Sequence, residues 1–316
     1  MTDPVQRGAR TLLSSTGLRG AAIEAAWLTA HVATYPFGVI AERSRRRVER
    51  YTLTGLPPQQ RGLLENDIEA AGTPILLLHG MVDNRSIFTV LRRSLHRRGF
   101  GRVHTMNYSP FLRDVREAAH QLSLQVERLC AETGYERVHI IGHSLGGIIA
   151  RYYVQRMAGD ARVHTLVTMG SPHGGTHVAR MFPRRICRQL LPGSRLMREL
   201  AEPAADCRTR FLAFWTDLDQ CVAPMTSARI EHPDLSASNI FVRGVGHLSL
   251  PINGGVVHAI GTALAHLEHD GSTRQHGVTT LPRPLATATA TASSEPAERT
   301  GRHPAGQRAR PSARAT

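Results

Sequence analysis

Two patterns of apolar and polar positions alternate along residues 73–268. Short runs that are apolar throughout have the length of strands, and stretches with apolar residues at helical spacing lie between them. The expected strands cover residues 73–79, 103–108, 137–142, 163–169, 210–216 and 240–245, and the expected helices cover 86–98, 112–132, 145–157 and 254–267. Strands that are apolar throughout and alternate with helices predict an α/β fold, with a mostly parallel sheet covered by helices on both faces.

This alternation is interrupted once and then ends. Residues 177–206, rich in Arg, Leu and Pro, follow the fourth strand and predict a cap or lid inserted into a catalytic domain of residues 59–270. From residue 271 to residue 316 the chain is dominated by Ala, Thr, Pro, Arg and Gly and has no apolar period. Such a segment cannot bury enough surface to offset its ordering entropy, so we expect a disordered tail.

The N-terminal segment, residues 1–58, contains an apolar run followed by a basic cluster. Residues 21–40 approach the length of a membrane span, but Glu24 and Pro36 oppose full insertion, and five Arg follow within residues 43–50. This pattern is typical of a helix on an anionic membrane surface, and a helix packed on the catalytic domain explains it equally well. We therefore expect a membrane-associated or secreted protein, with a cytoplasmic location left open.

The formal charge of +14 raises the question of nucleic acid as a partner. All 39 basic residues are Arg, which indicates a genomic codon bias, and aromatic residues for base stacking make up only 5%. We therefore expect no nucleic-acid binding, and we expect a monomer. The four cysteines form no CxxC pair, which argues against zinc; Cys187 and Cys207 flank the insertion and are either a disulfide of an exported protein or two free thiols.

A nucleophile motif follows the third expected strand. Gly142, Ser144 and Gly146 form G-x-S-x-G in the sequence GHSLG, and a helix begins directly after the serine. The motif needs this context, because the serine must lie on a tight strand-to-helix turn in which side chains at the flanking positions would clash. The helix N-terminus also favours developing negative charge. The pattern predicts Ser144 as a catalytic nucleophile.

A serine hydroxyl needs a base, and the base needs an acid. His247 follows the last expected strand, which places it at the same sheet edge as the serine turn. The acid should follow the preceding strand, where Asp217 and Asp219 are both candidates. We favour Asp219, because it stands in a turn that leads away from the sheet, while Asp217 is close to the strand end. The acid would accept Nδ1–H of the histidine and fix its tautomer.

Two backbone amides are expected to form an oxyanion hole. One belongs to Leu145, the residue after the nucleophile, and the other to Met81 in the loop after the first strand. His79 and Gly80 allow that loop to turn sharply, and we expect His79 to be a structural hydrogen-bonding residue. His143 is expected to support the nucleophile turn from within its motif.

Five segments together carry a family resemblance: LLLHGMVDNRS, GHSLGG, GSPHGG, DLDQCVAP and GVGHLSLP. Over residues 73–268 the chain resembles the actinobacterial lipase and esterase family of the α/β-hydrolase superfamily, in particular triacylglycerol lipase-like proteins with GHSLGG. The resemblance implies the α/β-hydrolase fold, a triad of Ser144, Asp219 and His247, and Met81 and Leu145 as oxyanion donors. Some lipases of this branch hold calcium through Asp residues near the histidine loop, but LSLPINGGV has no carboxylate, so we expect no calcium, no other metal and no cofactor.

The sequence thus predicts a serine carboxylic ester hydrolase that cleaves lipid acyl esters through an acyl-enzyme on Ser144. An acyltransferase or thioesterase with the same triad is the alternative within enzymes. A catalytically inactive, membrane-associated binding protein is the alternative outside enzymes. The intact set of Ser, Asp and His argues against this last reading.

Overall fold

The computed structural model describes residues 72–81, 83, 85–109 and 112–265, together with Ala22 and Thr279–Thr280. These residues all lie in the first of two compact units, Met1–Pro284. The segments expected at residues 1–58 and 271–316 therefore lie outside the described residues, except for Ala22 and the two threonines. No helix in the described part of the chain has the length and apolar character needed to cross a membrane.

The described residues form one parallel sheet in the order β2-β1-β3-β4-β5-β6-β7. The strands are β1 (Ile75–Leu78), β2 (Val103–Met106), β3 (Val138–His143), β4 (Val163–Met169), β5 (Arg210–Leu218), β6 (Ser236–Gly246) and β7 (Thr279–Thr280). This confirms the parallel sheet expected from the apolar runs. All carboxyl ends of the strands meet at one edge, so loops that follow different strands can build one site.

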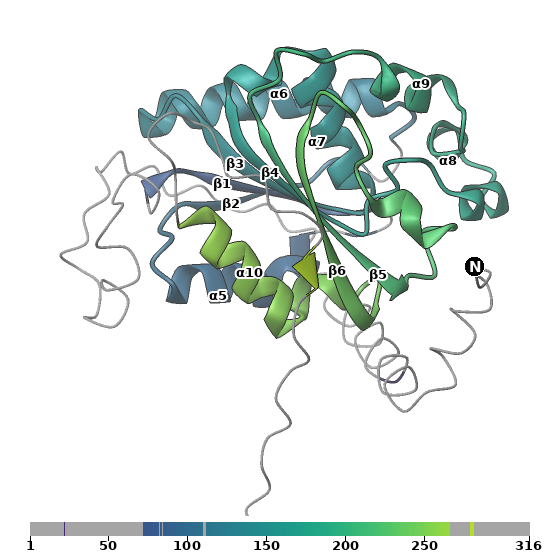
Figure 1. Cartoon of the computed structure of the whole chain (residues 1–316). Coiled ribbons are helices and arrows are strands. Elements are labelled where there is room, and N and C mark those ends of the chain that lie inside the picture. The colour runs from purple at the N-terminus through teal and green to yellow at the C-terminus, as the bar shows by residue number, and fades with distance from the viewer. Residues whose placement is uncertain are drawn as a thin grey trace, which may run out of the picture. The chain divides into compact units, whose positions relative to one another are not determined.

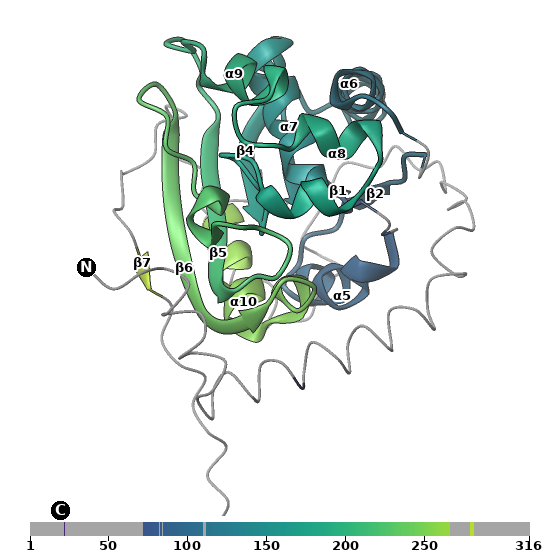
Figure 2. The same ribbon diagram turned by 90° about the vertical axis from the view of Figure 1, so that its right-hand side faces the viewer.

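Helices cover both faces of the sheet, as Figures 1 and 2 show. The helices α5 (Thr89–Arg97) and α10 (Gly254–Leu264) lie on one face, and α6 (Val115–Thr133) and α7 (Leu145–Arg156) lie on the other. Successive residues of β1 divide between the two resulting cores: Ile75 packs with the α5 and α10 side, and Leu76 with the α6 and α7 side. Because both faces are buried, the strand must be apolar at every position.

Local signals explain where the helices begin and end. Asp114 caps α6 by accepting a hydrogen bond from the amide of Arg116, and Gly134 ends the helix with a φ of 75°. The helix expected at residues 86–98 begins instead with a short 3-10 turn, Arg85–Phe88, before α5. Further 3-10 turns are η3 (Gly159–Ala161), η4 (His177–Met181), η5 (Met225–Ala228) and η6 (Leu250–Ile252).

The segment expected as a cap, residues 177–206, contains η4 and two short helices, α8 (Arg185–Gln189) and α9 (Arg195–Ala201). Both helices, with Leu190 directly after α8, bury apolar side chains in the core that α6 and α7 share: Ile186, Cys187, Leu190, Leu196, Met197 and Leu200. The part of the insertion that contains α8 and α9 therefore packs on the folded core.

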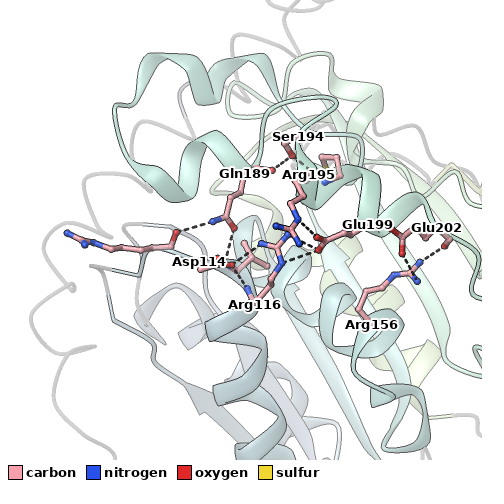
Figure 3. Close-up of polar contacts among 11 residues, drawn as sticks. Asp114, Arg116, Arg156, Gln189, Ser194, Arg195, Glu199 and Glu202 are labelled. Carbon is pink, nitrogen blue, oxygen red and sulfur yellow. Dashed lines mark hydrogen bonds and ion pairs between the residues drawn. The ribbon is translucent and has the colours of Figure 1, made fainter.

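Polar contacts also link α8 and α9 to the start of α6 (Figure 3). The guanidinium of Arg116 donates to Glu199 at 2.7 and 3.1 Å, and Arg195 donates to the other carboxylate oxygen of Glu199 at 2.9 Å. The side chain of Gln189 accepts from the amide of Val115 at 3.0 Å. In contrast, residues 180–185 are exposed at every position.

The expected tail contains one described exception. Thr279 and Thr280 pair in parallel with Ile240 and Phe241 of β6. The four cysteines are free thiols, so the alternative of a Cys187–Cys207 disulfide is not realised in the structure.

Candidate active site

Ser144 occupies a strained turn between β3 and α7. Its φ of 54° and ψ of −122° are uncommon for a residue with a side chain. Strain of this kind costs about 1–3 kcal/mol and is found mostly at functional sites. Hydrogen bonds hold the turn, from the Ser144 amide to the Met169 carbonyl at 2.9 Å and from the Gly147 amide to the Ser144 carbonyl at 3.1 Å.

The glycines of the motif are required by close backbone packing. A Cβ at Gly146 would lie 2.4 Å from the carbonyl oxygen of Leu78, and a Cβ at Gly142 would lie 2.5 Å from the Cα of Gly147. These neighbours are backbone atoms, which cannot move aside as a flexible side chain can. The turn therefore brings β1, β3 and α7 closer together than any other residue type would allow.

His247 and Asp219 form a buried pair. His247 Nδ1 lies 2.8 Å from Asp219 Oδ2, and the two residues are 3% and 2% exposed. The other carboxylate oxygen of Asp219 accepts from the amides of Cys221 and Val222 at 2.8 and 2.9 Å. Since both oxygens are engaged, the carboxylate is fixed in orientation toward the imidazole.

Asp217, the other candidate acid, points to a different partner. It lies within β5, and its Oδ1 accepts from the amide of Gly244 in β6 at 2.7 Å. The pairing of β5 with β6 is irregular between Thr216 and Leu218, next to this contact. The structure thus brings Asp219 to His247 and Asp217 to the strand backbone.

The histidine loop contacts the nucleophile turn through the residue before Ser144. His143 Nε2 lies 3.1 Å from the carbonyl oxygen of His247, and the two ring centroids are 4.7 Å apart. Gly170, with a φ of 58°, ends β4 directly against the pair, and a Cβ there would lie 2.9 Å from His247 Nδ1. The Ser144 hydroxyl makes no hydrogen bond to His247 in this geometry; such bonds are often long until a substrate is bound.

The loop after β1 is held by Tyr108, which follows β2. The phenolic hydroxyl lies 2.5 Å from the carbonyl oxygen of His79 and 3.0 Å from that of Gly80. The rings of Tyr108 and His79 also stack, with centroids 4.2 Å apart. Burial raises the pKa of Tyr108 well above 10, so the hydroxyl stays protonated and donates. Met81 continues this turn, and Leu145 begins α7.

Tyr108 is a site residue that the sequence analysis missed, and Gly170 was included there only as part of the segment GSPHGG, without a contact to the Asp219–His247 pair. Their positions in the sequence were a possible signal for both. Tyr108 follows β2 and Gly170 follows β4, and the strands next to β2 and β4 in the sheet lead into the other site residues. His143 was expected only to support its motif, and the structure adds a direct contact with the histidine loop.

Among the described residues, Asp219, Cys221 and His247 could each offer a metal ligand, with donor atoms within 4.8 Å of one another. Asp219, however, already uses both oxygens on His247 and two backbone amides. The arrangement therefore fits a hydrogen-bonded acid–base pair better than a metal centre.

Comparison with known proteins agrees with this architecture. The family model for palmitoyl protein thioesterase matches residues 74–230. The chain is 30% identical over 114 residues to a triacylglycerol lipase of Pseudarthrobacter phenanthrenivorans and, over the same length, to one of Burkholderia plantarii. Each match covers 34% of this chain, and the matches span only 35% and 31% of those relatives.

Solved structures show the same fold. A Bacillus licheniformis lipase in its mature form is similar with a TM-score of 0.52 and 16% identity, over 62% of this chain and 92% of that one. Aspergillus fumigatus lipase B is similar with a TM-score of 0.53 and 15% identity, over 61% of this chain and 52% of that one. The sheet topology, the strand-to-helix serine turn and these matches show that the chain has the α/β-hydrolase fold, and that part of its sequence is similar to triacylglycerol lipases.

Proposed function

We propose that this protein is a serine ester hydrolase that cleaves lipid acyl esters through an acyl-enzyme on Ser144. The observation that carries the proposal is the buried 2.8 Å contact between His247 and Asp219, next to a strained serine turn. A buried histidine held by a carboxylate is the arrangement needed to activate a serine hydroxyl.

In the proposed reaction, Ser144 Oγ attacks the ester carbonyl while His247 Nε2 takes its proton. Asp219 accepts Nδ1–H, which fixes the tautomer and stabilises the imidazolium. The tetrahedral oxyanion accepts hydrogen bonds from the amides of Leu145 and Met81. The intermediate collapses, and the alcohol leaves with the proton from His247. A water molecule, deprotonated by the same histidine, then releases the fatty acid and restores the serine.

A lipid substrate is supported by the names of the relatives and by one exposed segment. Residues 180–185 read RMFPRR, with Met181 77% exposed and Phe182 46% exposed between three arginines. Apolar side chains flanked by cationic ones suit a surface of anionic lipid. Because α8 and α9 are packed in the core, we propose that any lid movement is confined to the part of the insertion before α8.

The first test uses the Ser144→Ala variant. The parent protein should hydrolyse p-nitrophenyl esters and react with a fluorophosphonate probe, and the variant should do neither, because no acyl-enzyme can form. Esters from acetyl to palmitoyl, with emulsified triacylglycerol alongside, define the acyl length. Undiminished labelling of the variant would remove Ser144 from the mechanism.

A second candidate is a thioesterase, favoured by the match to the palmitoyl protein thioesterase model. The same triad can cleave a thioester, since the acyl-enzyme is identical. The two readings are separated by kcat/KM for palmitoyl-CoA, followed with a thiol reagent, against that for p-nitrophenyl palmitate. A preference of more than about tenfold for the thioester would favour the thioesterase, because tenfold corresponds to about 1.4 kcal/mol of transition-state binding.

We further propose that residues 1–58, which lie outside the described residues, attach the enzyme to anionic membrane surfaces. A protein that starts near Gln59 should hydrolyse short dissolved esters as before and should no longer sediment with anionic liposomes. Insoluble or inactive truncated protein would instead show that the N-terminal segment packs on the hydrolase domain.

A further inference from the structure

One cavity of the described structure is lined by neither Ser144 nor the Asp219–His247 pair. It has a volume of about 650 Å³ and is formed by α7, α9, the loop after β4 and the chain around η5. Its polar lining includes Arg151, His173, Arg198, Arg229, Glu231 and His232. The proposed reaction uses none of these residues.

Arg151 is a buried cation that has no carboxylate partner among the described residues. It is 4% exposed, and its guanidinium donates to Gln155 Oε1 at 2.6 Å, to the Leu200 carbonyl at 3.0 Å and to the His173 carbonyl at 3.4 Å. These contacts engage three of its five N–H groups. Burial lowers the pKa of Arg151 to about 10, so it is still charged at neutral pH. A buried charge without a counter-ion is costly, and an anion in the cavity would relieve that cost.

His173 offers a second unsatisfied group on the same wall. It is 5% exposed; its Nε2 lies 2.9 Å from the Thr168 hydroxyl, and its Nδ1 is buried without a hydrogen-bond partner. Burial and the nearby Arg151 hold its pKa well below 6.5, so the ring is neutral. In the tautomer that accepts from Thr168, Nδ1 carries the proton and is a free donor.

The remaining charged groups of the lining leave an excess of positive charge. Arg229 pairs with Glu231 at 3.0 Å and lies over the ring of Trp215 at 5.8 Å. Arg198 is exposed and donates to the Gly193 carbonyl at 2.6 Å. The lining thus carries three arginines against one carboxylate.

We propose that this cavity binds the phosphate group of a small phosphorylated molecule. A phosphate monoester carries a charge of about −1.5 to −2 at pH 7 and three strong acceptor oxygens, which suits a lining with several arginines. The planar guanidinium of a buried arginine favours such an oxyanion geometrically. The volume exceeds that of a bare phosphate and accommodates an organic group attached to it.

The experiment measures binding to the full chain, independently of ester hydrolysis. Inorganic phosphate, glycerol 3-phosphate and vesicles with phosphatidic acid are titrated at constant ionic strength, followed by thermal shift and calorimetry. We expect the soluble phosphates to raise Tm where sodium chloride does not. Arg198→Gln should weaken their binding at least about tenfold, the equivalent of one charge-assisted hydrogen bond. Arg229→Gln should act in the same direction.

Arg195→Gln is the matched control. This arginine lies on the same helix and is exposed, but it contacts Glu199 and does not line the cavity, so affinity should be unchanged. Binding of the vesicles alone, sensitive to Arg198→Gln, would assign the phosphate to a lipid headgroup. The proposal is overturned if no phosphate compound binds, or if Arg198→Gln and Arg195→Gln bind equally well. The Ser144→Ala variant should bind phosphate compounds like the parent, since Ser144 does not line the cavity. A negative result in the binding experiment would therefore not contradict the proposed ester hydrolase activity.

Discussion

The position of His139 inside the sheet predicts that the free energy of unfolding depends on pH. It lies in β3, is fully buried, and neither ring nitrogen has a hydrogen-bond partner. Burial, together with the electrostatic effects of His164, Arg137 and Arg210, lowers its pKa from 6.5 to about 3. The folded-state pKa is therefore below the unfolded one, so between these values only the unfolded chain takes up the proton. The free energy of unfolding must fall as the pH drops from 6.5 toward 3.

The size of the effect follows from the span of pH. Each unit below 6.5 removes about 1.4 kcal/mol, so the loss from His139 alone is about 2 kcal/mol at about pH 5. The His139→Leu variant cannot take up this proton. It also removes two buried nitrogens that lack partners, each of which costs about 1–3 kcal/mol. We expect it to match or exceed the parent at about pH 7.5 and to lose about 2 kcal/mol less on acidification.

Urea unfolding at about pH 7.5, 6.5 and 5 measures this directly. The lowered pKa of His173 adds to the acid sensitivity of both proteins, so the difference between the two curves isolates His139. His120→Gln, an exposed change on α6, is the control and should follow the parent curve. Equal loss of stability on acidification in the parent and in His139→Leu would refute the reasoning that the lowered pKa of His139 makes the protein sensitive to acid.

Three further substitutions test the site. Asp219→Asn should lower kcat for p-nitrophenyl butyrate by about 10³–10⁴, and Asp217→Asn by less than about tenfold; the reverse order would move the acid role to Asp217. Gly146→Ala should cost at least about 3 kcal/mol in urea unfolding, because its Cβ meets a backbone carbonyl at 2.4 Å, and unchanged stability would contradict that packing. Tyr108→Phe should cost about 1–2 kcal/mol and lower kcat about tenfold with little change in KM; an unaltered kcat would mean that the turn at Gly80 holds without the hydroxyl.

The apolar pattern was sufficient to predict the first six strands but not β7, because only a strand buried on both faces is apolar at every position. The run at residues 163–169 matches β4 at both ends, and the other strands differ by a few residues. The pattern did not predict the 3-10 turn before α5, in which Ile87 and Phe88 are buried in the core. Nor did it predict that α8 and α9 join the core, since Arg116 and Glu199 are 83 positions apart in the sequence.

The site residues also fall into two groups, those that local sequence predicted and those that depend on the fold. Ser144 and His247 were selected from local context, a turn after one strand and a loop after another. The choice between Asp217 and Asp219 depends on an irregular pairing of β5 with β6, which turns one carboxylate to the neighbouring strand and the other to the histidine. The local turn after β5 favoured Asp219, but the sequence did not predict the irregular pairing or the contact of Asp217 with Gly244. Arg151 likewise has an ordinary sequence context, and only the fold buries it without a carboxylate.

The short strand β7 affects how the protein should behave at high concentration. Among the described residues it covers the outer edge of β6 at Ile240 and Phe241 alone, and an uncovered strand edge is a template for pairing with another molecule. Cutting the chain at residue 270, where the apolar period ends, would remove this cover. The shortened protein would then expose the backbone edge of β6 to other molecules in solution. How long it stays soluble would therefore depend on its concentration.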